Sequence, residues 1–151
     1  MTAYELLRFI HVLFAVTAVG TTVTYSVWLA HAAQEPEHLD YALRGIALLD
    51  GRIATPSFLM LLVGVALVLH GPVPWQASWL VTATVLYAVA TFVGAVWYAP
   101  LLRAQVAALR LTGLASDEYR ALEQRMKATG SAMLIAVLAV LYLMITKPQL
   151  W

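Results

Sequence analysis

Four long runs of apolar residues, separated by shorter polar segments, dominate the pattern along the chain. The runs cover residues 4–30, 53–70, 77–102 and 128–146. A helix needs ~20 apolar residues to cross a membrane, whereas the strands of a membrane barrel are about half as long. The pattern therefore predicts an all-α fold in which residues 1–151 form one domain, an integral membrane four-helix bundle.

The segments between these runs differ in character. Residues 31–52 are rich in charge, and their second part, 39–49, predicts a short helix at the membrane interface. A tight turn rich in glycine and proline, residues 71–74, joins the second run to the third. Residues 103–127 predict a third loop that lies on the membrane surface and leads into the last run.

The end of this third loop, residues 116–127, has helical periodicity. Tyr119, Leu122 and Met126 recur at three- and four-residue spacing, and the residues off this stripe are charged. Ser116, followed by two acidic residues, is a typical N-cap. The segment therefore predicts an amphipathic helix on the cytoplasmic surface.

The composition supports a membrane protein. Hydrophobic residues make up 62% of the chain and charged residues 11%, and the mean hydropathy is +0.81. A soluble domain of this size could not bury so much apolar surface, so the lipid bilayer is the expected partner. There is no basic tract of the kind that binds nucleic acid. Cysteine is absent, which excludes disulfides and thiolate metal sites.

The distribution of basic residues predicts the orientation. Cytoplasmic loops of membrane proteins are enriched in arginine and lysine. Loops 31–52 and 103–127 hold Arg44, Arg52, Arg103, Arg110, Arg120, Arg125 and Lys127. We therefore expect a multi-pass protein of the cell (inner) membrane, with both loops cytoplasmic and both termini exterior or periplasmic.

One face of the first helix differs from the rest. Spacings of four and three residues align His11, Ala15, Ala18, Thr22 and Tyr25. The large apolar residues lie mostly elsewhere: Phe9, Val12, Val16, Val19, Val23 and Val27. The small and polar face should therefore pack inside the bundle, and the valine-rich face should contact lipid.

His11 is the candidate functional residue, because it lies about two turns inside the membrane. An ionisable side chain at such a depth usually faces a partner or a cofactor. Three readings stay open: a structural hydrogen bond to a threonine or tyrosine, an axial ligand of haem b, or proton or metal handling. By contrast, His38 lies among acids in a loop, and His31 ends the first helix.

A haem site would need further residues. Arg8, one turn from His11, is placed for a propionate or another anion. His70 ends the second helix at the depth nearer His11, although it does not share the face of Gly64, the expected packing face of that helix. Met144 of the last helix is the other candidate for a second axial ligand.

Three segments carry a resemblance to a known family. They are Leu6–Gly20 (LLRFIHVLFAVTAVG), the run LLDGRIATPS at 48–57, and the stretch from Tyr142 to Pro148. Together they resemble a family of uncharacterised predicted integral membrane proteins with four helices. The resemblance covers nearly the whole chain and implies no activity.

The chain also bears a more distant likeness to four-helix membrane protoporphyrinogen oxidases and to copper-resistance membrane proteins. His11, His31, Thr55-Pro56 and Lys147-Pro148 match features of the oxidases, and the likeness implies a haem-binding role for His11. The lysine that the oxidases carry early in their third helix has no counterpart, since residues 71–102 lack a basic side chain.

Two functional hypotheses follow. The first is a haem b-binding, redox-active membrane protein whose partner is a quinone or a porphyrin. The alternative is a non-enzymatic membrane protein without a cofactor, either a small transporter or an assembly subunit that forms a homo-oligomer. Whether the protein is an enzyme stays open.

Overall fold

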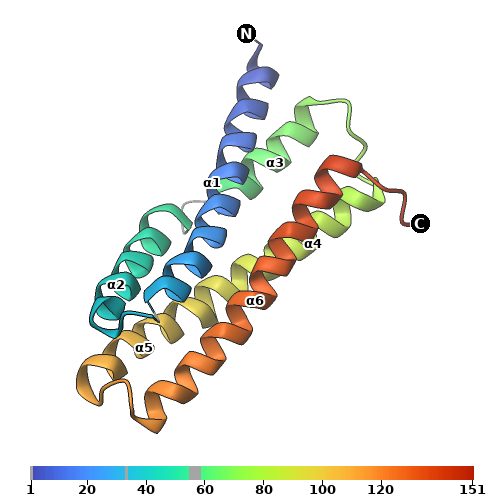
Figure 1. The fold of residues 1–151 in the computed structure, drawn as a ribbon. Helices are drawn as coiled ribbons and strands as arrows, with labels where there is room; N and C mark the ends of the chain where they lie inside the picture. The colour runs from blue at the N-terminus through green and yellow to red at the C-terminus, as the bar shows by residue number, and fades with distance from the viewer. Residues whose placement is uncertain (1, 33, 55–58) are drawn as a thin grey trace.

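The computed structural model describes residues 2–32, 34–54 and 59–151, and within them the secondary structure is helical. In chain order the elements are α1 (Ala3–Ala32), the short 3₁₀ turn η1 (Pro36–His38), α2 (Leu39–Leu49), the π-helical turn η2 (Asp50–Ala54), α3 (Leu59–His70), α4 (Ser78–Val93), the π-helical turn η4 (Gly94–Tyr98), α5 (Ala99–Leu111) and α6 (Asp117–Thr146) (Figure 1).

Three of these helices are long and apolar enough to cross a membrane. They are α1 with 30 residues, the continuous helix Ser78–Leu111 with 34, and α6 with 30. The apolar helix α3 has 12 residues, about 18 Å, which is shorter than a bilayer core. The all-α prediction is therefore confirmed, whereas the count of four membrane-spanning helices is not.

The second helix, expected over 53–70, is confirmed where the structure describes it as α-helix, in α3 from Leu59 to His70. Residues 53 and 54 are the end of the π-helical turn η2. Residues 55–58, which include Thr55-Pro56, lie outside the described residues. The first helix, expected over 4–30, and the short helix at 39–49 are confirmed.

The predicted third loop, 103–127, is wrong over 103–111, which are helical, whereas the helix predicted within it over 116–127 is confirmed from Asp117. The helix expected over 77–102 continues through α5 to Leu111, because Leu102, Gln105 and Ala108 form a buried stripe against neighbouring helices. Residues 117–127 are the first turns of α6 and are continuous with the segment expected at 128–146. The loop itself is reduced to 112–116.

Pro100 explains the π-helical turn inside this long helix. Proline lacks an N–H group, and its ring crowds the carbonyl of residue i−4, so a proline inside a helix disturbs the turn that precedes it. Here that turn is η4, which ends at Tyr98. The helix continues beyond the proline, but the side chains before and after it are rotated relative to a regular helix.

The helices form two antiparallel pairs. α1 packs beside α3, and α4 packs beside α6, with few contacts between α3 and α4 (Figure 1). α2 and α5 pack together at the other end, against the end of α1 and the beginning of α6. We call this the α2 end; both chain termini lie at the opposite, terminal end (Figure 1).

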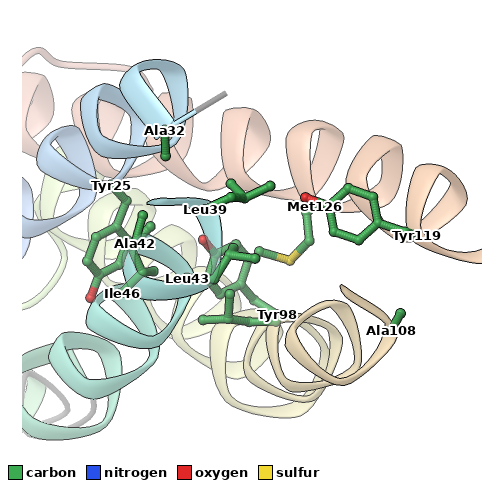
Figure 2. Packing of buried hydrophobic residues seen from close by; sticks show 11 residues of the cluster. Tyr25, Ala32, Leu39, Ala42, Leu43, Ile46, Tyr98, Ala108, Tyr119 and Met126 are labelled. Atoms are coloured by element: carbon green, nitrogen blue, oxygen red, sulfur yellow. The ribbon is translucent and has the colours of Figure 1, made fainter. Parts of the chain in front are cut away.

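The main hydrophobic core lies at the α2 end, where α1, α2, η4, α5 and α6 meet (Figure 2). Leu43, Ile46 and Leu102 are its most deeply buried large side chains. The stripe predicted for residues 116–127 contributes, since Tyr119 and Met126 are buried. A smaller core between α4 and α6 comprises Ala83, Val140 and Leu143.

Ion pairs join the exposed surfaces of α2 and α5. Asp40 of α2 lies 2.9 Å from Nε of Arg110 in α5 and 2.8 Å from Arg44 on its own helix. The hydrogen bond from Arg110 holds the pKa of the Asp40 carboxyl below its usual value. All three side chains are substantially exposed, so the pairs orient α2 more than they stabilise the fold.

The residues after α6 fold back onto the start of α4. Lys147 ends the helix in a left-handed conformation, φ 48°. The buried hydroxyl of Ser78 then accepts a hydrogen bond from the Leu150 backbone N–H at 2.9 Å and donates to the Pro148 carbonyl at 3.4 Å. This tail latch, formed by Ser78 and residues 148–150, closes the α4–α6 pair at the terminal end.

Candidate functional site

The small and polar face of α1 lies inside the protein, as predicted. Tyr25 is buried, and the other members are half-buried: His11, Ala15, Ala18 and Thr22. Of the residues expected to contact lipid, Val19 is half-buried, and the exposed ones are Phe9, Val12, Val16, Val23 and Val27. The 3.6-residue periodicity therefore identified which side of α1 faces α3.

His11 packs against a glycine of α3. A Cβ atom added to Gly64 would lie 3.2 Å from Cε1 and 3.7 Å from Nδ1 of His11. One heptad earlier on α1, the ring of Tyr4 contacts Gly71 in the same way, 2.6 Å from such a Cβ. Two glycines seven residues apart thus receive two rings seven residues apart, which defines the antiparallel register of α1 and α3.

The polar surroundings of His11 are sparse. Its Nδ1 atom is buried and has no hydrogen-bond partner among the described residues, and the backbone of Met60 interacts with the ring. Thr22, the hydroxyl on the same face, donates to the Ala18 carbonyl of its own helix. The Nδ1–Cε1 edge therefore faces α3, and Nε2 is the ring nitrogen farther from Gly64.

The other candidate ligands lie in different surroundings. Arg8 is exposed, one turn from His11. His70 is exposed, and its Nδ1 lies 2.9 Å from the Ala66 carbonyl of its own helix. Met144 packs against the core between α4 and α6. His70 thus contacts its own helix and Met144 contacts the α4–α6 pair, and neither of these contacts involves His11.

These observations bear on the haem suggested for His11. An axial histidine is usually held by a hydrogen bond from its second ring nitrogen to a carbonyl or carboxylate, which leaves the other nitrogen for the metal. The Met60 backbone, which interacts with the ring, suits that role for one ring nitrogen, and the other nitrogen would be the ligand. A haem iron at this position would have His11 as its one histidine ligand, because the described contacts do not bring a second candidate ligand to His11.

The histidines of the first loop belong to a separate pocket of about 250 Å³ at the α2 end. Nδ1 of His38 lies 2.9 Å from the Glu35 carboxylate. His31 also lines the pocket, between Trp28 and Tyr41. Within the described residues, no three histidine, aspartate or glutamate side chains are grouped so that they could hold a metal ion.

Sequence reasoning missed a group of polar residues in the main core. Asp50 of η2 interacts electrostatically with Tyr25 of α1, Tyr98 of η4 and Arg103 of α5. Burial raises the pKa of the Asp50 carboxyl, and Arg103 opposes this shift by lowering it. The available signal was Asp50 itself, an acid directly before an apolar run.

Comparison with known proteins gives one match. The model of a family described as "Predicted integral membrane protein (DUF2269)" matches residues 5–148. No curated protein matches the chain, and no solved structure does. The match covers α1 to α6 and includes both His11 and Asp50.

Proposed function

The chain belongs to this family of integral membrane proteins of unknown function, and we propose that it is a haem b-binding, redox-active member in which His11 ligates the iron. The observation that carries the proposal is the orientation of the imidazole. Its Nδ1–Cε1 edge lies against Gly64 of α3, so Nε2, the ring nitrogen farther from Gly64, is the proposed ligating atom.

The surroundings support a ligand role. The site lies in the half of α1 that packs against α3, on the face that also carries Ala15 and Ala18. Arg8 is one turn nearer the terminal end and could pair with a propionate. Bound haem supplies reversible one-electron transfer, and a membrane quinone is the partner that such a position suits.

The test is the visible spectrum of the purified protein, produced with haem supplied during expression. We expect a Soret band that shifts on reduction, and loss of that band in His11→Ala. His31→Ala is the matched control, because His31 lies twenty residues away on the same helix, ~30 Å from His11, and should keep the full haem content.

Each alternative has a distinct result. A colourless wild-type protein would support the alternative of a non-enzymatic membrane protein without a cofactor. In that case His11→Ala should cost the ~1–3 kcal/mol of an unmade buried polar contact, measured by thermal unfolding in detergent. A coloured protein whose His11→Ala variant keeps its haem and its reduction behaviour would show that another residue is the ligand.

A further inference from the structure

Three polar side chains from different parts of the chain meet at the α2 end. Tyr25 comes from α1, Asp50 begins η2, and Tyr98 ends η4. The two tyrosines are 6% and 7% exposed and belong to the main hydrophobic core, and Asp50 is half-buried. We refer to these three residues as the Asp50 cluster.

Both π-helical turns of the structure take part in this cluster. A π-helical turn inserts one residue into a helix and so rotates the side chains that follow. Such turns are rare in proteins as a whole, but those that occur are often found at functional sites. Asp50 is the first residue of one turn, and Tyr98 is the last residue of the other. Each π-helical turn therefore supplies one member of an electrostatically interacting pair, Asp50 and Tyr98.

The hydroxyl of Tyr25 is the second observation. It is buried and has no hydrogen-bond partner in the part of the chain that the structure describes. In Figure 2 the Tyr25 ring lies beside Ala42 and Ile46 of α2, the helix that leads directly into Asp50. A buried hydroxyl without a partner is unfavourable, so a water molecule or another proton-carrying group is expected at this point.

We propose that the Asp50 cluster is a proton-binding site, in which the Asp50 carboxylate takes up a proton to become the neutral acid and water links it to the Tyr25 hydroxyl. Buried ionisable groups with shifted pKa values commonly handle protons at functional sites. The site is separate from His11 and does not depend on haem, since it lies at the opposite end of α1.

The groups that face Asp50 determine its charge. Arg103 of α5 is the nearby cation and favours the ionised form. Tyr25 and Tyr98 face it from α1 and η4, and exposed Arg52 lies two residues away on η2. Arg103 is itself exposed, so its side is the expected route by which protons reach the carboxyl from water.

The test is NMR titration of aspartate carboxyl carbons in lipid nanodiscs. The chain has three aspartates, Asp40, Asp50 and Asp117, so selective ¹³C labelling gives few signals. We expect one signal, absent in Asp50→Asn, to titrate at a higher pH than that of Asp40. Tyr25→Phe should move this midpoint upward, because it removes a hydroxyl that solvates the carboxylate.

Tyr119→Phe is the matched control. Tyr119 is also a buried core tyrosine, but its hydroxyl accepts a hydrogen bond from Gln105. This variant should leave the Asp50 midpoint unchanged. Arg103→Gln, at an exposed position, should raise the midpoint without disturbing the core. An Asp50 signal that titrates with that of Asp40, or that is the same in Tyr25→Phe and wild type, would overturn the proposal.

Discussion

The contact between His11 and Gly64 shows how one residue without a side chain determines the place of another. A Cβ atom at position 64 would lie 3.2 Å from the imidazole, closer than ordinary van der Waals contact. The ring of His11 therefore occupies the space that the glycine leaves. Gly64 is the residue on which both the register of α1 on α3 and the orientation of the imidazole depend.

Substitutions of Gly64 should therefore depend steeply on size. Gly64→Ala should change stability little, because alanine gains up to about 1 kcal/mol of helix propensity and loses a comparable amount by displacing the ring. Gly64→Leu should cost ~1–3 kcal/mol by overpacking. The measurement is thermal unfolding in detergent.

The control for this series is Gly20→Leu in α1, where nothing lies within 4 Å of an added Cβ. That variant should unfold close to the wild-type temperature. Equal losses in Gly64→Leu and Gly20→Leu would mean that α1 and α3 do not pack through position 64.

The sequence predicted part of this site. Helical periodicity placed His11 on the inner face of α1 and indicated Gly64 as the packing face of α3. The Asp50 cluster could not be predicted in this way. Periodicity assumes a regular helix, and η4 shifts the phase between Leu80 and Leu102 within one long helix. Pro100 was the visible sign that such a shift was possible.

At the scale of the element, α6 shows how a helix can serve two environments. Its first turns pack in the core of the α2 end through Tyr119 and Met126. Its later turns expose Ile135, Leu138, Tyr142 and Ile145, as expected for contact with lipid. The composition changes near residue 127, where the amphipathic segment runs into the apolar one, and the backbone hydrogen bonds continue through it because nothing there breaks the helix.

The start of α6 gives a direct test. The Ser116 hydroxyl accepts a hydrogen bond from the Tyr119 N–H at 3.1 Å, so Ser116→Ala should cost ~1 kcal/mol of local helix stability. Amide exchange of residues 117–122 should become faster by about fivefold. Ser131→Ala, at an exposed position inside α6, is the control and should leave these exchange rates unchanged. If the wild type exchanges these amides as fast as Ser116→Ala does, Ser116 is not a stabilising cap.

At the scale of the whole molecule, both termini lie at one end (Figure 1). The basic residues of α2, η2, α5 and the first turns of α6 lie at the other end. The continuous helix Ser78–Leu111 is about 50 Å long, well beyond the ~30 Å of hydrocarbon. The extra length of this helix is accounted for if the α2 end projects from the membrane. This position also explains why the main core lies there: apolar side chains outside the lipid must pack against other helices.

This arrangement predicts the topology. A reporter domain that is active only in the exterior or periplasm should be active when it is fused after Trp151. The same reporter inserted at Gly113, between α5 and α6, should be inactive. The reason is the excess of arginine at the α2 end. The reverse pattern of activity would place the α2 end outside the cell.

The tail latch has a consequence for the order in which the protein matures. Ser78 and Leu150 are 72 residues apart in the chain, so α4 is synthesised well before its partner exists. Until α5 and α6 have been made and inserted, the buried hydroxyl must be solvated by water or lipid headgroups. Closing of the latch is therefore a late event of biogenesis, and a nascent chain stalled within α6 would leave the start of α4 accessible to chaperones or proteases.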